Sequence, residues 1–376
     1  MLNSVRGVLS AAMALGILAP GLSAGAQSFT PETVFVMSNN VSRNQVIAFQ
    51  SEPNGSFQEQ NRYDTFGRGT GGVNDPLESQ GSLTLSQDHS LLFAANGGSS
   101  EITVFRVVGN RLFVADKEPS GGAQPVSFAQ SGNTLYVLNS GGAGSVVGFH
   151  ITPFGRLQQI PNSTQFLSAN ATGGSSISVS PDGRTVAVVE RIANHIDIFH
   201  VSANGTISPA VVNPSPGAGA FAARFDPSGN LLVSETGPAS ATDGSAISSY
   251  TVQASGGLTP VTQSLSTDGA ANCWNAISPN GKDVYVSNAG TSTIAGFTIG
   301  QGGALTPIDG TIVGSNPSGS TNLDIAISGD GKFLFSLNGE VGAVGVFAIR
   351  SDGSLEELTQ AGGLPSGAGF NGIAAL

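Results

Sequence analysis

Short apolar segments recur along the chain, and each ends just before a polar residue. They are rich in β-branched and aromatic side chains, and they follow one another at intervals of 43 to 57 residues. The seven copies are VFVMS (34–38), LLFAA (91–95), TLYVL (134–138), TVAVV (185–189), LLVS (231–234), DVYVS (283–287) and FLFSL (333–337). A strand repeated at this interval is typical of the blades of a β-propeller. We call it strand B.

Further strands accompany the copies of strand B. The next strand, C, ends in an aromatic residue, and its copies are VIAF (46–49), ITVF (102–105), VVGF (146–149), IDIF (196–199), ISSY (247–250), IAGF (294–297) and VGVF (344–347). A glycine-containing turn and a strand D follow strand C. Before most copies of strand B lie a strand A and a tight turn such as SPDGR (180–184), whose Asp-Gly pair suits a hairpin. These units predict an all-β, seven-bladed β-propeller with four antiparallel strands per blade.

The two ends of the repeat array complement each other. The first unit begins directly at strand B, whereas the chain ends on an unpaired segment, residues 369–376, that resembles the strand A of residues 323–328. We therefore expect the C-terminal strand to supply strand A of the first blade. This pairing closes the ring and covers an edge that would otherwise invite aggregation.

The N-terminal 26 residues have the features of a secretory signal peptide. Arg6 precedes an apolar run, and an A-x-A cleavage site ends at Ala26. We expect residues 27–376 to form a single propeller domain of a secreted protein, extracellular or periplasmic. The apolar run is too short for a bilayer, and no later stretch reaches the ~18–20 apolar residues that a membrane helix needs, so we expect no membrane span.

Composition narrows the classes of partner. The chain has 14 basic and 25 acidic residues and no cluster of Lys or Arg, which excludes nucleic acids and anionic membranes as favoured partners. Cys273 is the single cysteine, so no internal disulfide forms, and stability depends on packing. We expect a monomer without a cofactor. A divalent cation such as calcium, held by Glu and Asn oxygens, is the alternative.

The connections between strands differ at the two ends of the propeller. Antiparallel order places the A–B and C–D connections at one end and the B–C and D–A connections at the other. The first set is short and regular, whereas the second is long and irregular, as in residues 60–81. Because binding and catalysis concentrate on variable loops of a rigid scaffold, we expect the functional site at the channel mouth on the D–A/B–C end.

One polar residue follows strand B in every blade. The seven are Asn39, Asn96, Asn139, Glu190, Glu235, Asn288 and Asn338. The asparagines suit side-chain capping of the B–C turn. The two glutamates lie in adjacent blades, and neighbouring carboxylates raise each other's proton affinity, which suits acid–base catalysis or cation binding. The alternative for them is a solvated rim or a salt bridge to Arg191 or Arg224.

Strand A departs from its usual small or apolar residues in a few blades. The departures are Arg224, Cys273-Trp274-Asn275, and Asn322 with Asp324. Trp274 either packs between blades or stacks on the ring of a ligand. The loop of residues 67–81 brings further polar side chains toward the same region, either as ligands of a substrate or as part of an inert lid. These side chains are Asp75, Glu78 and Gln80.

Motifs of the common catalytic and metal-binding kinds are absent from the sequence, which has no CxxC, HExxH, Walker or EF-hand pattern. The histidines do not suggest a Ser-His-Asp arrangement, because His89 lies in an A–B turn at the end away from the expected site.

The repeated SPDGR-x-(V/L)-x-V-x-(N/E), followed by (I/V)-x-x-F and G-x-L, resembles the lactonase-type seven-bladed propellers over residues 30–376. That family includes bacterial 6-phosphogluconolactonase and fungal 3-carboxy-cis,cis-muconate cyclase. VVER (188–191) and NCW (272–274) are similar to a secreted subgroup. The family's Arg-His pair at the start of a strand A is missing from residues 219–224, and Glu235 is offset by about one residue from the family's glutamate.

The resemblance implies a lactone hydrolase or a lactone-forming cycloisomerase acting on a small organic acid. We expect Glu190 and Glu235 to act as base and acid. The expected substrate-binding residues are Arg191 or Arg224 for a carboxylate, Trp274 for the ring, and Asn275, Asp75 and Gln80 beside them. The alternative is a non-catalytic extracellular or cell-surface protein that binds a glycan or a protein.

Overall fold

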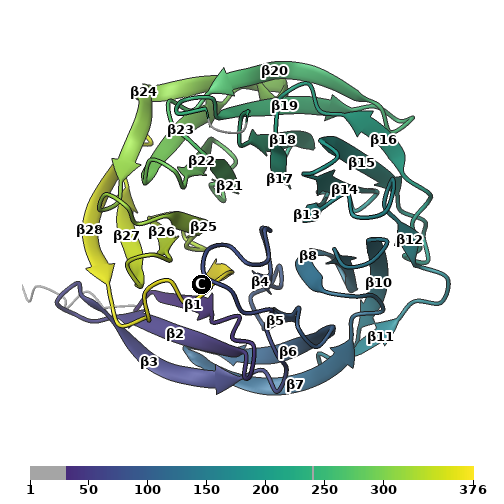
Figure 1. The fold of residues 1–376 in the computed structure, drawn as a ribbon, viewed down its shortest axis with the longest axis horizontal. Coiled ribbons are helices and arrows are strands. Elements are labelled where there is room, and N and C mark those ends of the chain that lie inside the picture. Colours follow the sequence, from purple (N-terminus) through teal and green to yellow (C-terminus); the bar gives the residue numbers. More distant parts are fainter. Residues whose placement is uncertain (1–30, 239–240) are drawn as a thin grey trace, which may run out of the picture. The chain divides into compact units, whose positions relative to one another are not determined.

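A ring of seven four-stranded antiparallel sheets is the architecture in the computed structural model, which describes residues 31–238 and 241–376 (Figure 1). Residues 31–376 form one compact unit. The predicted signal peptide, residues 1–26, lies outside the described residues. No helix long and apolar enough to span a bilayer occurs in the described part of the chain.

Each blade places its strands in the order A, B, C, D from the channel outward. Blade 1 contains β29 (Ile373–Ala375), β1 (Thr33–Met37), β2 (Gln45–Ser51) and β3 (Phe57–Asp64). Blade 2 contains β4 (Leu83–Leu85), β5 (Leu91–Asn96), β6 (Glu101–Val108) and β7 (Arg111–Pro119). Blade 3 contains β8 (Pro125–Ser131), β9 (Thr134–Asn139), β10 (Ser145–Ile151) and β11 (Leu157–Gln159), with β12 (Gln165–Phe166) also paired to β10.

The remaining four blades follow the same order. Blade 4 contains β13 (Gly174–Val179), β14 (Thr185–Glu190), β15 (His195–His200) and β16 (Val211–Pro214). Blade 5 contains β17 (Ala220–Phe225), β18 (Asn230–Glu235), β19 (Ala246–Val252) and β20 (Leu258–Ser266). Blade 6 contains β21 (Asn272–Ile277), β22 (Asp283–Asn288), β23 (Thr293–Ile299) and β24 (Leu305–Ser315), with the 3-10 turn η1 (Gln301–Gly303) before β24. Blade 7 contains β25 (Asn322–Ile327), β26 (Phe333–Asn338), β27 (Ala343–Ile349) and β28 (Leu355–Ala361).

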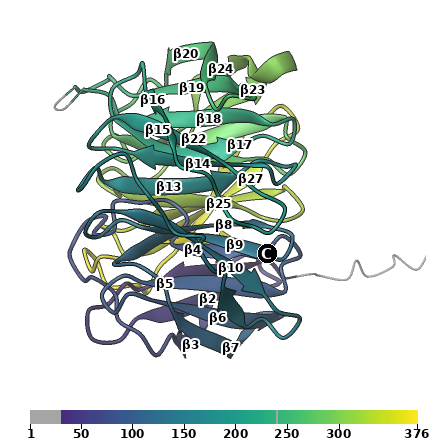
Figure 2. The same cartoon turned by 90° about the vertical axis from the view of Figure 1, so that its right-hand side faces the viewer.

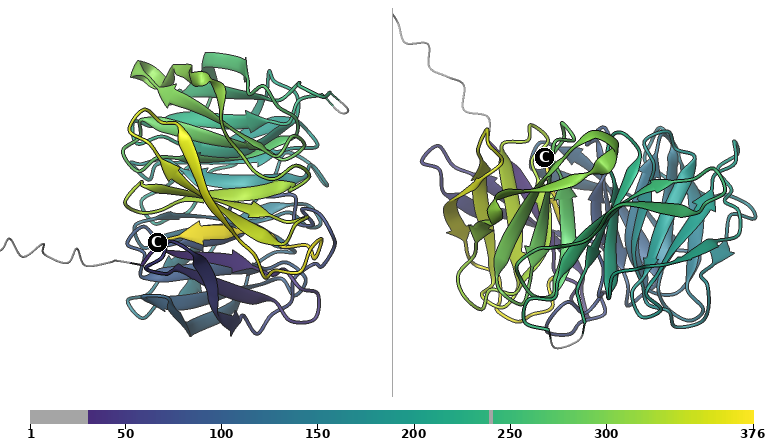
Figure 3. Two further views of the ribbon diagram at one scale, coloured as in Figure 1. Left: turned by 90° about the vertical axis from the view of Figure 1, so that its left-hand side faces the viewer. Right: turned by 90° about the horizontal axis from the view of Figure 1, so that it is seen from above.

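The predicted strands B are confirmed as the second strand of each blade. They are continuous apolar runs because both faces of a blade are covered by neighbouring blades, so residues of either orientation are buried. The outermost strands β3, β7 and β20 instead carry mostly exposed or partly exposed residues. Seen from the side, the strands run between the two ends of the ring, where the connections gather (Figure 2, Figure 3).

The predicted closure of the ring is also confirmed. Strand β29 pairs antiparallel with β1, with Val34 opposite Ala375 and Val36 opposite Ile373. In Figure 1 the yellow C-terminal strand accordingly lies beside β1. The two ends of the described chain therefore share one sheet.

The tight A–B turns have a common polar motif. In the turn of blade 4, Ser180 Oγ donates to Asp182 Oδ1 at 2.6 Å and accepts from the Thr185 amide at 3.0 Å. Gly183 takes the positive φ of 70° that the turn requires. Blade 7 repeats these hydrogen bonds with Ser328 and Asp330.

Candidate functional site: the central channel

The seven strands A surround the centre of the ring, and the long loop between β3 and β4 enters it from the D–A/B–C end. In Figure 1 this is the dark-blue loop that precedes β4. Gln80 fixes the loop across the channel. Its backbone N–H donates to Ser175 O at 2.9 Å, and its side-chain Nε2 donates to Asn275 O at 2.7 Å. Asn371 Nδ2 donates to Asp75 Oδ1 at 2.6 Å. Blades 4, 6 and 1 are thereby joined through one loop.

A cavity of about 350 Å³ lies in the other half of the channel. Its lining comes from the halves of strands A that lead to the A–B turns, including Phe225, Ile277 and Ala326, and from His89 in an A–B turn. The cavity therefore belongs to the A–B/C–D end, whereas from the sequence we expect the site at the opposite mouth. The reason is the loop of residues 67–81, whose buried polar side chains find partners inside the channel at the expected mouth.

Arg224 lines this cavity and supplies its positive charge. Its guanidinium makes no hydrogen bond or ion pair with any described residue, although the surrounding protein lowers its pKa by desolvation. The negative charge of Asp324 opposes that effect. A guanidinium that is poorly solvated and has no local partner is suited to bind a carboxylate or an oxyanion.

Asp324 lies behind Arg224 on β25 and is 2% exposed. Its Oδ1 accepts from Gln80 Nε2 at 3.3 Å, and its Oδ2 accepts from the Ile373 amide at 3.3 Å. Burial raises the pKa of Asp324 to about 6, against the lowering effect of the Arg224 charge. A carboxyl group with this pKa can exchange a proton near neutral pH. In the sequence Asp324 is visible only as a departure from the strand A pattern.

The D–A/B–C side of the loop holds a second carboxyl group, that of Asp75. Burial, and then the charge of Asp324, raise the pKa of Asp75 well above its usual range. Arg191 forms an ion pair with Glu78, so it is held at the edge of the loop, near Asp75 and Cys273. Arg191 therefore does not share the cavity with Arg224.

The sequence leaves two roles open for Trp274, packing between blades and stacking on a ligand, and in the structure its side chain is packed. It is 1% exposed, its ring meets Phe221 edge-on at 5.4 Å, and its Nε1 donates to Ser79 O at 2.9 Å. Asn275 reaches the cavity lining, and its Nδ2 donates to Ser234 Oγ at 2.8 Å. The structure thus gathers Arg224, Asn275, Gln80 and Asp75 at the channel, with Trp274 behind them.

Glu190 and Glu235 lie apart from this group and from each other. Glu190 is fully buried, and it accepts from the Ser168 amide at 2.7 Å and from Ser168 Oγ at 2.5 Å. Glu235 accepts from Ser248 Oγ at 2.6 Å and from Ser264 Oγ at 2.8 Å. Among the described residues, no hydrogen bond or ion pair links the two glutamates or links either one to Arg191 or Arg224. The structure therefore does not bring the expected acid–base pair together.

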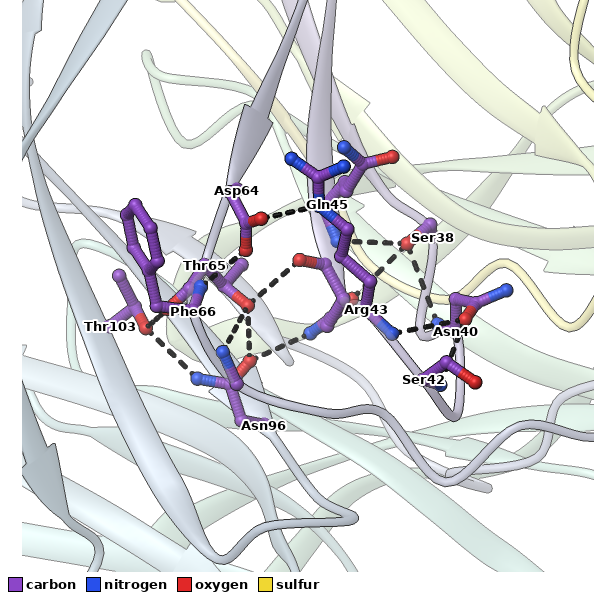
Figure 4. A network of polar contacts seen from close by, with 12 residues as sticks. Ser38, Asn40, Ser42, Arg43, Gln45, Asp64, Thr65, Phe66, Asn96 and Thr103 are labelled. Atoms are coloured by element: carbon purple, nitrogen blue, oxygen red, sulfur yellow. Dashed lines mark hydrogen bonds and ion pairs between the residues drawn. The ribbon is translucent and has the colours of Figure 1, made fainter.

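From the sequence we expect the five asparagines at the same position to cap the B–C turn, but their side chains bind other segments. Asn96 Oδ1 accepts from Thr65 Oγ1 at 2.7 Å and from Asn44 Nδ2 at 3.0 Å, while its Nδ2 donates to Thr103 at 2.9 Å (Figure 4). Asn288 likewise exchanges hydrogen bonds with Thr267. These side chains hold the D–A connection that arrives from the preceding blade. We call the seven residues at the end of strand B anchor residues.

Comparison with known proteins agrees with this architecture. The family model described as "Lactonase, 7-bladed beta-propeller" matches residues 29–165, 143–274 and 268–367. The chain is 25% identical over 312 residues to a protein named 6-phosphogluconolactonase from Enterobacter sp. (strain 638), covering 75% of this chain and 89% of that protein.

Two solved structures share the fold at lower identity. The periplasmic gluconolactonase PpgL of Pseudomonas aeruginosa has a TM-score of 0.65 at 19% identity, covering 91% of this chain and 99% of that one. A protein from Lactobacillus plantarum has a TM-score of 0.69 at 17% identity, covering 92% of this chain and 100% of that one. The family match spans nearly all of the described chain, and the chain belongs to the lactonase family of seven-bladed β-propellers.

Proposed function

We propose that the protein hydrolyses the lactone ring of a small organic acid in the cavity of the central channel. The observation that carries this proposal is the Arg224 guanidinium, which faces a cavity of about 350 Å³ without a partner among the described residues. The names of the Enterobacter and Pseudomonas relatives support a sugar-acid lactone as the substrate class. The N-terminal sequence supports secretion as the setting.

The chemistry requires a base for water and a donor for the developing oxyanion. Because Asp324 is 2% exposed and is not among the residues that line the cavity, a second water carries the proton of the attacking water to Asp324, while Arg224 stabilises the oxyanion. The ring C–O bond then breaks, and the alkoxide takes the proton from Asp324. The product is a hydroxy acid whose carboxyl group releases a proton to solvent, and the resulting carboxylate pairs with Arg224. The reverse of this hydrolysis closes the ring with loss of water, whereas a lactone-forming cycloisomerase instead adds a carboxylate to a carbon–carbon double bond and protonates the neighbouring carbon.

The test is turnover of a panel of aldonolactones. Hydrolysis is measured as proton release, with and without a chelator. Arg224→Gln and Asp324→Asn should each lower kcat/KM by about 100-fold or more, the size expected for losing an oxyanion donor or a base. Arg191→Gln, which removes an arginine outside the cavity, is the matched control and should keep activity.

The glutamate pair expected from the sequence is tested in the same assay. Glu190→Gln and Glu235→Gln variants that remain folded should retain most of the activity, because the structure places both side chains away from the cavity. Loss of turnover in these two variants, with full activity in Arg224→Gln, would reject the channel assignment.

A further inference from the structure

A groove of about 680 Å³ lies on the outer wall of the propeller between blades 2 and 3. It is formed by strands C and D and the C–D turn, whereas strand A lines the channel. One side is β7, and the other is the C–D turn of blade 3, residues 152–156, with the start of β11. Its principal lining residues are Arg106, Phe113, Val114, Thr152, Phe154 and Arg156.

The apolar side chains of the groove are unusually open to solvent. Phe154 is 74% exposed, Phe113 is 54% exposed and Val114 is 44% exposed. Single exposed apolar residues are common on proteins, whereas several around one concave site indicate a binding surface.

The charges of the groove are all of one sign. Arg106 and Arg156 line it, no acidic residue does, and neither arginine forms an ion pair with a described residue. The nearby Asp116 is engaged, since its Oδ2 accepts from the Leu157 amide at 2.7 Å. Arg106 donates to Phe154 O at 3.2 Å and so fixes the turn. In a chain with a formal charge of −11, this local excess of positive charge complements an anionic ligand.

We propose that this groove binds an acidic polysaccharide built from uronic acid units. The apolar faces of pyranose rings stack on exposed Phe113 and Phe154, and uronate carboxylates pair with the planar guanidinium of Arg156. Thr152 and Gln158, which also line the groove, supply hydrogen bonds for ring hydroxyls. An acidic peptide would satisfy the arginines but has no flat apolar rings that repeat along its length.

The experiment is calorimetric titration of the full chain with galacturonate oligosaccharides of defined length. Phe154→Ala and Arg156→Gln should each weaken binding by about 10-fold or more, whereas neutral gluco-oligosaccharides should not bind. Phe66→Ala, which removes a phenylalanine that is 65% exposed elsewhere, and Arg184→Gln, which removes another exposed arginine, are the matched controls and should bind as the parent does.

Three results would overturn the proposal. These are the absence of saturable binding to the acidic oligosaccharides, equal binding of a poly-glutamate peptide, and self-association that Phe154→Ala abolishes, which would assign the groove to a second copy of the chain. Lactone turnover should stay unchanged in Phe154→Ala and Arg156→Gln, so the outcome is independent of the channel assignment.

Discussion

At the scale of single residues, blade 4 contains two buried carboxyl groups where blade 5 has one beside a serine and blade 2 has an amide beside a threonine. The anchor residue Glu190 faces strand C, where Asp197 occupies the position that Thr103 has in blade 2 and Ser248 has in blade 5. Asp197 is fully buried, and neither of its oxygens has a hydrogen-bond partner among the described residues. Burial, and then the adjacent Glu190, raise the pKa of Asp197 to about 8.

Replacing Asp197 with Asn should therefore stabilise the protein at alkaline pH. The folded protein holds a proton on Asp197 that the unfolded chain releases near its ordinary pKa of 3.8, so the stability of the parent falls as pH rises from about 4 to about 8. Asp197→Asn lacks this titration, so its free energy of unfolding should fall less than that of the parent between pH 4 and pH 8. Urea unfolding across this range measures it, and parallel pH profiles for both proteins would contradict the buried pair.

The pH dependence of lactone turnover tests the role of Asp324. Because its pKa is raised to about 6 and the base must be ionised, kcat/KM should rise through pH 6 and then level off. The charge of Arg224 lowers this pKa, so the residual activity of Arg224→Gln should rise at a higher pH than that of the parent. An unshifted profile in that variant would show that another group is the base.

At the scale of the secondary-structure elements, the ease of prediction follows burial. Strands B are buried on both faces, and their apolar runs therefore stand out in the sequence. Two of the strands A, β4 and β29, have only three residues each. Strands this short are predictable only from their position in the repeat. The strand β12, of two residues, has no sequence signal of this kind.

Removal of β29 tests how much the closure of the ring contributes. Deleting residues 369–376 takes away the antiparallel partner of β1 and uncovers apolar side chains that include Phe35. We expect Tm to fall by at least about 5 °C and aggregation to increase, because β1 becomes an edge strand. Calorimetry and light scattering measure both effects, with a short tag added after Leu376 as the control. Unchanged values would mean that the other blade contacts suffice.

At the scale of the whole molecule, the repeat is predictable from the sequence, and the contents of the channel are not. The fold depends on local patterns that return in each blade. The site depends on Gln80, whose side chain meets Asn275 and Asp324 at sequence separations of 195 and 244 residues. No local sequence pattern predicts contacts between residues so far apart in the chain. For that reason the sequence does not predict that the loop of residues 67–81 is held inside the channel at the D–A/B–C end, where we expect the functional site.

The pairing of β29 with β1 also sets an order of events during biosynthesis. Val34 of strand β1 is synthesised long before its partner in β29, Ala375. Throughout synthesis one side of blade 1 has no neighbour, and no intermediate length of chain can form a closed ring. Closure of the ring must therefore wait for the pairing of Val34 with Ala375, and contacts between residues so far apart in the sequence form slowly. Chaperone protection should matter most in the interval before β29 is available.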